Sequence, residues 1–184
     1  MWVDLLPACA PTVHPYTMTE VVRVERGSPL ALHVNGLPAE TQPHARTKDE
    51  AVALASYWIA RGYSVDLGLT QTNNRNLPDL HLTLEQVLGD DDTSECANLR
   101  AGSTILTQAY GRAIERFGEG QGALAAALSA YNTGGFTAGF TNGYVARYYG
   151  PVPALTVPQV NPREPGPVIR TALVNRHSSD TDVW

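Results

Sequence analysis

The second half of the chain contains two consecutive helical patterns, and the second of them is apolar on every side. From about Ser94 to Phe117, alanine and large aliphatic residues recur at helical spacing, and Gly118 follows as a stop signal. Residues from Gly122 to Tyr131 are mostly alanine and leucine and carry no charge. A helix without a polar face must be covered on all sides. We therefore expect this shorter helix inside a helical core.

The patterns before residue 94 predict a smaller region of mixed structure. A helix begins after Thr47, because Thr47 and Glu50 form a capping box, and Gly62 follows its apolar stripe as the C-terminal glycine. The other predicted elements are helices over 17–25, from Thr83 to Gly89 and over 138–149, and strands over 30–34 and 63–67. The fold class expected from this order is α+β, mostly helical, with a small β element.

The composition changes after Gly150. Six prolines lie between Pro151 and Pro167, and the polar end that follows has no apolar period. Such sequence cannot bury enough apolar surface to order itself. We expect residues 1–150 to form the folded domain and residues 151–184 to be a Pro-rich tail, extended or disordered.

Charge and length exclude several classes of partner. The net charge is −5, and the basic residues are scattered rather than clustered, which argues against nucleic acid. No apolar run is long enough to span a membrane. The five histidines and two cysteines show no metal-ligand spacing, and no cofactor motif is present. We expect neither a metal nor a cofactor.

Cys9 and Cys96 are the only cysteines. They are either two buried thiols or one disulfide, and we favour the disulfide. Closing so long a loop is worth about 4–5 kcal/mol in the chain-entropy model. A disulfide would imply an oxidising compartment.

One carboxyl group has the surroundings of a general acid. Glu25 ends the valine-rich helix, where poor solvation raises the pKa of a carboxyl group and keeps it protonated. The plain alternative is a solvent-facing carboxylate at a helix end.

Two further patches supply polar groups that suit a sugar. In the segment Gly68–Asn73, Gly68 and Leu69 begin a loop after a strand, and Gln71 and Asn73 offer amide donors and acceptors. An ordinary turn would also explain this loop. Tyr131 and Asn132 end the apolar helix, so the tyrosine ring should be buried and its hydroxyl needs a partner, either Glu25 or a backbone carbonyl.

These patches together resemble the lysozyme-like (SLT-type) lytic transglycosylases of type IV secretion and conjugal transfer systems. The resemblance runs from about Cys9 to Tyr149, most of the chain. The matching motifs are Cys-Ala-Pro at 9–11, Pro29–Gly36, Asp66–Leu69, Asn98–Gly102 and Ser129–Asn132. Two features depart from the family: Arg26 stands where Ser usually follows the catalytic Glu, and the stretch from Glu25 to Pro29 is one residue shorter.

The resemblance implies a lysozyme-like fold and one catalytic carboxyl group. Glu25 would cleave the β-1,4 bond between N-acetylmuramic acid and N-acetylglucosamine in peptidoglycan and form a 1,6-anhydro-muramyl product. Gln71 and its neighbours would bind the glycan, with Tyr131 beside the carboxyl group. Asp66 is a possible second carboxylate, which would make the protein a hydrolytic muramidase, although a role in holding the loop is the simpler reading.

The resemblance also implies a place and partners. The protein would be periplasmic and open the cell wall locally for a secretion or conjugation apparatus, with the tail as a site for other secretion components. No export signal is visible at Met1–Leu6. The alternative hypothesis from a different functional class is a catalytically weakened, glycan-binding assembly factor.

Overall fold

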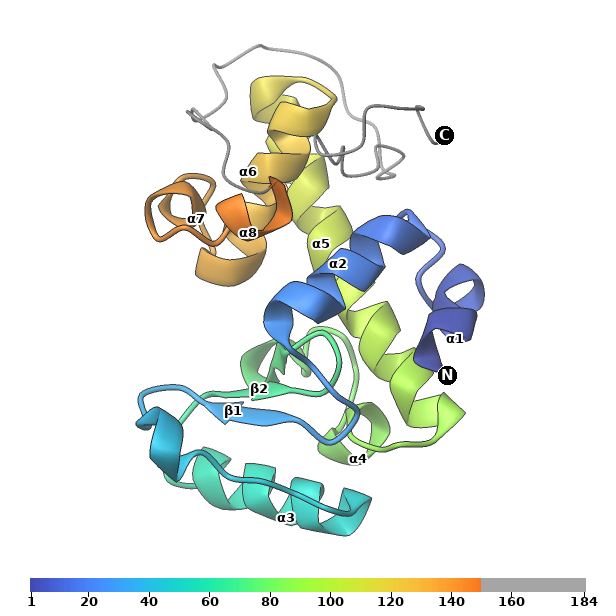
Figure 1. The fold of residues 1–184 in the computed structure, drawn as a ribbon, viewed down its shortest axis with the longest axis vertical. Helices are drawn as coiled ribbons and strands as arrows, with labels where there is room; N and C mark the ends of the chain where they lie inside the picture. Colours follow the sequence, from blue (N-terminus) through green and yellow to red (C-terminus); the bar gives the residue numbers. More distant parts are fainter. Residues whose placement is uncertain (150–184) are drawn as a thin grey trace. The chain divides into compact units, whose positions relative to one another are not determined.

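The structure is a computed structural model that describes residues 1–149. The expected tail at 151–184 lies outside the described residues. The chain divides into two compact units: Met1–Pro11 with Val21–Gly102, and Thr12–Glu20 with the chain from Ser103 onward. Each unit is described separately below (Figure 1).

The described chain is mostly helical with one small sheet, so the α+β prediction is confirmed. The main helices are α1 (Trp2–Cys9), α2 (Pro15–Glu25), α3 (Lys48–Ile59), α5 (Asp92–Phe117) and α6 (Gln121–Thr133). Short helices are η1 (Ala39–Thr41), η2 (Asn74–Asn76), α4 (Leu84–Val87), α7 (Ala138–Thr141) and α8 (Ala146–Tyr149). The strands are β1 (Leu32–Val34), β2 (Val65–Leu67) and β3 (Thr72–Asn73).

The first unit is built on the antiparallel sheet β1-β2-β3. Alternate residues of β1 and β2 are buried, as the pleat requires, and Leu32 pairs with Leu67. The buried face packs against α3 through Ala51 and Ala55, which are fully buried (Figure 1). The helical stripe predicted after Thr47 is therefore the covering layer of the sheet.

The start of α3 confirms the predicted cap with one change. Thr47 Oγ1 accepts a hydrogen bond from the Glu50 backbone N–H at 3.2 Å. The Glu50 carboxylate accepts from the backbone N–H of Arg46 at 2.8 Å, one residue before the N-cap residue that a capping box uses. Both hydrogen bonds still satisfy backbone N–H groups that have no partner within the helix.

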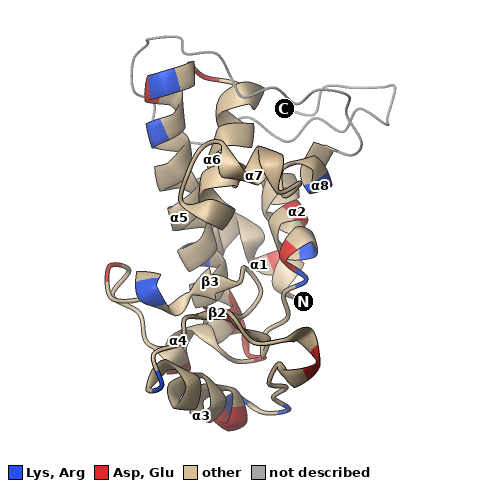
Figure 2. Cartoon of the chain, turned by 90° about the vertical axis from the view of Figure 1, so that its left-hand side faces the viewer, with Lys and Arg blue, Asp and Glu red and all other residues tan. Residues whose placement is uncertain are grey.

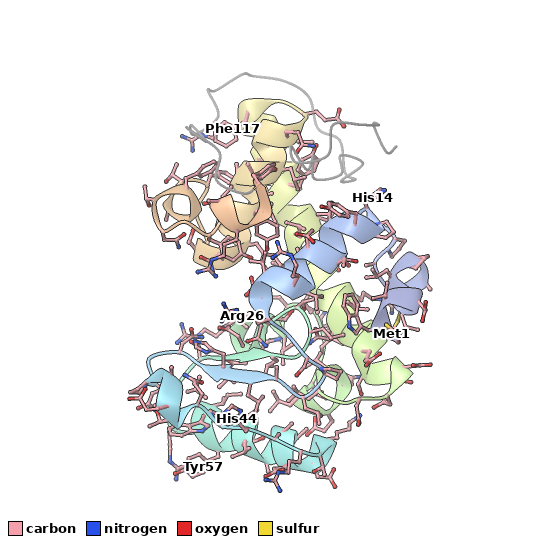
Figure 3. The ribbon with its side chains drawn as sticks, in the orientation of Figure 1. Met1, His14, Arg26, His44, Tyr57 and Phe117 are labelled. Atoms are coloured by element: carbon pink, nitrogen blue, oxygen red, sulfur yellow. A yellow bond between two sulfur atoms is a disulfide. The ribbon has the colours of Figure 1, made fainter. Side chains whose placement is uncertain are left out.

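Cys9 and Cys96 form a disulfide, as favoured from the sequence. The bond joins the last residue of α1 to the second turn of α5 within the first unit, and Figure 3 draws it in yellow. It closes a separation of 87 residues. Constraining the unfolded chain over that length is worth about 4–5 kcal/mol in the chain-entropy model.

The second unit is organised around α6, whose residues 123–130 are all buried. This confirms the apolar helix predicted from its composition. The chain turns back onto α6 after Gly134, which has a left-handed conformation with φ 77°. Gly139 lies so close to Ser129 that a Cβ atom there would be 2.6 Å from the Ser129 Cα, so only glycine fits.

One local prediction needs correction, and two elements were not predicted. The helix expected over 138–149 is two short helices, α7 and α8, because Gly143 adopts φ 79° and breaks the pattern. Helix α1 was not predicted, since Pro7 lies inside it and suggests an interruption. Strand β3 was not predicted, because its two residues are too few to show an alternation of apolar and polar side chains.

Among residues 1–149, no helix combines the length and the apolar character needed to cross a membrane.

Candidate active site

The predicted catalytic residue is the last residue of α2. The valines before it form the buried side of the helix: Val21, Val22 and Val24 are at most 6% exposed. Glu25 itself is half-buried, at the carbonyl end of the helix. The partial negative charge of that end disfavours a second negative charge beside it. The role of Glu25 as a general acid stays a prediction.

The two residues after Glu25 turn the chain sharply. Arg26 has φ 52°, in the left-handed region that residues other than glycine adopt rarely, and its side chain is exposed at the end of α2 (Figure 3). The Gly27 N–H then donates to Val22 O at 3.2 Å. The helix thus ends in a tight, strained reversal directly after Glu25.

Gly27 brings this reversal against the second predicted patch. A Cβ atom on Gly27 would lie 1.8 Å from Leu69 O and 2.8 Å from Gly68 O. Such distances are far below any van der Waals contact, so the two backbones touch and only glycine allows it. The structure therefore brings the Glu25 segment and the Gly68 loop together, as the sequence predicted.

The loop itself folds back on its first residue. Gly68 has φ 71° and donates its N–H to Ala31 O at 2.8 Å. Gly68 O accepts from the Gln71 side-chain amide at 2.8 Å and from the Gln71 backbone N–H at 3.3 Å. Gln71 has φ 48° and is, after Arg26, the second residue of the site other than glycine with a left-handed conformation. Its amide nitrogen holds the loop, so the half-buried side chain has a structural contact besides its predicted role in binding.

The other side of the loop is held by α5. Asn98 is 1% exposed, and its side-chain amide donates to Leu67 O at 2.9 Å and to Val87 O at 3.2 Å. Its side-chain oxygen accepts from the Thr70 backbone N–H at 2.9 Å and from Thr70 Oγ1 at 2.8 Å. All four hydrogen-bonding positions of the amide are used. Asn98 therefore ties β2, α4 and the loop to one point on α5.

Asp66 is occupied by neighbouring amides. Its two carboxylate oxygens accept from Asn73 Nδ2 at 2.6 Å and from Asn35 Nδ2 at 2.9 Å. Asn73 pairs with Asp66 across the sheet, and its own side-chain oxygen accepts from the Arg75 N–H and caps η2. Both side chains thus hold the sheet and the following turn, which fits the simpler of the two readings of Asp66.

Tyr131 and Asn132 belong to the second unit, near the end of α6. Tyr131 is half-buried rather than buried as expected, because the chain around it is already reaching the exposed turn at 132–134. The exposed Asn132 accepts a hydrogen bond from Asn142 Nδ2 at 3.1 Å. The role predicted for Tyr131 beside the carboxyl group stays a prediction.

Two carboxyl groups near the start of α5 have shifted pKa values. The Ser94 backbone N–H, then the Ser94 hydroxyl, hold the pKa of Asp91 at about 2. Burial raises the pKa of Glu95, and nearby aspartates add to that shift. Figure 2 shows basic residues scattered over several elements among acidic ones. In the described part of the chain, no group of three or more His, Cys, Asp or Glu side chains could hold a metal ion.

Sequence reasoning missed the residues that hold the site in place. Gly27 was given no role, Thr70 counted only as part of the loop, and Asn98 and Gly102 only marked a motif. A Cβ atom on Gly102 would lie 2.5 Å from the Thr70 Cβ, so this glycine also packs against the loop. The available signal was the four-residue spacing of Asn98 and Gly102, which places both on one face of a helix.

Known proteins match most of this chain. The type IV secretion system protein VirB1 of Brucella suis is 43% identical over 134 residues, which are 72% of this chain and 53% of the relative. VirB1 of Agrobacterium fabrum is 37% identical over 129 residues, which are 70% of this chain and 49% of the relative. The chain thus spans about half the length of the curated relatives it matches.

No protein-family model and no solved structure matches the chain. The similarity to the VirB1 proteins extends over about seven-tenths of its length, at identities from 36% to 43%. Over the part that matches, the chain belongs to the family of VirB1 proteins of type IV secretion systems.

Proposed function

We propose that this protein is a peptidoglycan lytic transglycosylase in which Glu25 is the only catalytic carboxyl group. The observation that carries the proposal is the position of Glu25: half-buried at the carbonyl end of α2, two residues before the backbone contact between Gly27 and Leu69. That contact joins a group suited to hold a proton to a loop with polar amides. The relationship to VirB1 proteins supports the same reading.

The chemistry needs one group that first gives and then takes a proton. Protonated Glu25 donates its proton to the oxygen that bridges the two sugars, and the bond from that oxygen to the anomeric carbon of muramic acid breaks. The 6-hydroxyl oxygen of the same muramic acid then bonds to the anomeric carbon, and its proton returns to Glu25. No water is consumed. Attack within one molecule lowers the barrier by several kcal/mol, because the reacting groups are already together.

The surroundings of Asp66 support a reaction with one carboxylate. A hydrolase would need a second group to activate water. Both oxygens of Asp66 already accept hydrogen bonds from Asn35 and Asn73, so moving the carboxylate to water would cost two charge-assisted bonds. The proposal therefore leaves Asp66 as a support of the sheet.

We place this activity in the periplasm, where it would open the wall for a type IV secretion apparatus. The relatives are named for that system. The Cys9–Cys96 disulfide supports an oxidising compartment, because such bonds are rare in the reducing cytosol. Purified complexes from cells that carry the protein would test the association directly.

Digestion of purified sacculi tests the reaction. The protein should release fragments with 1,6-anhydro-muramyl ends, which mass spectrometry separates from reducing ends by the mass of one water. Glu25→Gln should fold and release none. Glu115→Gln is the matched control, since Glu115 is exposed on α5 and has no proposed role. Reducing ends would show a muramidase, and binding without release would show a glycan-binding factor; each would refute the proposal.

A further inference from the structure

The Gly68 loop packs closely against the backbone at two glycines, Gly27 and Gly102. On one side, Leu69 O meets Gly27, where a Cβ atom would be 1.8 Å away. On the other side, Thr70 meets Gly102 of α5, where a Cβ atom would be 2.5 Å from the Thr70 Cβ. The loop therefore contacts both α5 and the segment that carries Glu25 within two consecutive residues, Leu69 and Thr70.

Asn98 fixes the loop at the same place. It lies one helical turn before Gly102 and on the same face of α5. Gly68 must be glycine for the same reason as Gly102, because a Cβ atom there would be 2.3 Å from Asn98 Nδ2. The loop rests on α5 through one fully used amide and one glycine. Both contacts are too close for the loop to move nearer to α5.

Thr70 takes part in this contact through its hydroxyl group. The side chain is fully buried, and Oγ1 lies 2.8 Å from the Asn98 side-chain oxygen and 3.0 Å from Thr72 Oγ1. The same Oγ1 lies 3.2 Å from the Asn98 backbone oxygen. An apolar side chain at this position would lose all three contacts and leave the Asn98 side-chain oxygen with one donor fewer. The hydroxyl therefore belongs to the support of the loop.

We infer that Asn98 and Gly102 are positioning residues for Glu25, acting through Thr70, Leu69 and Gly27. Neither residue touches the reacting atoms. Together they fix the position of the Gly68 loop, which contacts the chain directly after α2. The inference rests on the proposed function, because it assigns these residues to the reaction of Glu25. The inference goes beyond the proposed function by naming the residues that fix the position of the carboxyl group.

A matched pair of substitutions on one helix provides the test. In Gly102→Ala the new methyl group collides with Thr70. In Gly111→Ala, on the same helix, it meets no atom within 4 Å. For the first variant we expect kcat about 10–100-fold lower with little change in KM, measured at a temperature where circular dichroism shows it folded. The second should keep the wild-type rate.

Removing the obstacle should restore the rate. Thr70→Gly deletes the three atoms nearest to a Cβ atom on Gly102. The double variant Gly102→Ala/Thr70→Gly should therefore be faster than Gly102→Ala alone, although Thr70→Gly alone loses the hydroxyl contacts to Asn98 and keeps only the backbone bond. Additive losses in this cycle would mean that the two sites do not communicate, and would overturn the inference.

A readout without substrate separates this inference from the proposed function. Carboxyl and amide NMR signals of Glu25 and Gly27 should shift in Gly102→Ala and stay in place in Gly111→Ala, and the titration of Glu25 should shift with them. Unmoved signals, or a folded Gly102→Ala with the wild-type kcat, would overturn the inference. A wild-type protein that releases no anhydro ends refutes only the proposed function, since the NMR comparison still decides the positioning.

Discussion

The contact between Gly27 and Leu69 gives the sharpest prediction for the site. In Gly27→Ala the added methyl carbon would lie 1.8 Å from Leu69 O and 2.4 Å from Leu69 C. An ordinary contact of this kind begins at 3.4 Å. The backbones must therefore separate by about 1.6 Å, the difference between those distances, because neither partner is a flexible side chain.

A displacement of that size should affect both stability and rate. Forcing extra volume into a packed contact costs about 1–3 kcal/mol in the free energy of unfolding. Moving a catalytic group by about 1 Å can cost 100-fold in rate. We expect Gly27→Ala to fold with lower stability and to release anhydro-muramyl fragments about 100-fold more slowly, with little change in its binding to sacculi.

Urea unfolding and initial rates of fragment release measure the two effects on the same protein. Gly135→Ala is the control, since its Cβ atom would meet only Thr133 Oγ1, at 4.0 Å. This control should be close to wild type in both assays. If Gly27→Ala were folded and as fast as wild type, the contact would not govern the position of Glu25, and the reasoning from Gly27 to the reaction would be wrong.

Three further predictions concern stability. Replacing Cys96 with serine, which breaks its bond to Cys9, should lower the free energy of unfolding by about 2–5 kcal/mol in urea melts; an unchanged midpoint would contradict this. The pKa of Asp91 is lowered to about 2 by its bonds from Ser94, so its stabilisation is complete above about pH 4 and is lost as pH falls toward 2. Wild type should therefore lose about 1 kcal/mol relative to Asp91→Asn over that window, a figure reduced for the exposure of the group, and parallel pH curves would refute it. Thr17 is fully buried and its hydroxyl has no hydrogen-bond partner within residues 1–149, so Thr17→Val should raise thermal stability by about 1 kcal/mol, and a loss would show a partner for the hydroxyl.

The sequence predicted those helices that are marked by their own residues, through a capping side chain or an uncharged composition. Thr47 begins α3 because its hydroxyl accepts a backbone N–H, and that signal needs no distant partner. The apolar helix α6 was predicted because a segment without charge has to be buried. Helix α1 was not predicted, because Pro7 lies inside it and proline usually interrupts a helix.

The parts of the site that sequence could not supply are contacts between distant segments. Glu25 and the Gly68 loop were chosen correctly as neighbours, but nothing in their residue types indicates that Gly27 is the point of contact. Asn98 is separated from Thr70 by 28 residues, and its four hydrogen bonds follow from how α5 packs, not from its own neighbours in sequence. Long-range packing of this kind becomes visible only in three dimensions.

The left-handed residues of the site matter for anyone who tries to make this protein withstand heat. Arg26 and Gln71 have φ 52° and 48°, and glycine would relieve a strain of about 1 kcal/mol at each. Such exchanges would, however, loosen the turn that follows the proposed acid and the loop that contacts Gly27. His81 has the same conformation, φ 54°, but lies in no proposed site. At His81 that strain can be released without changing the proposed site.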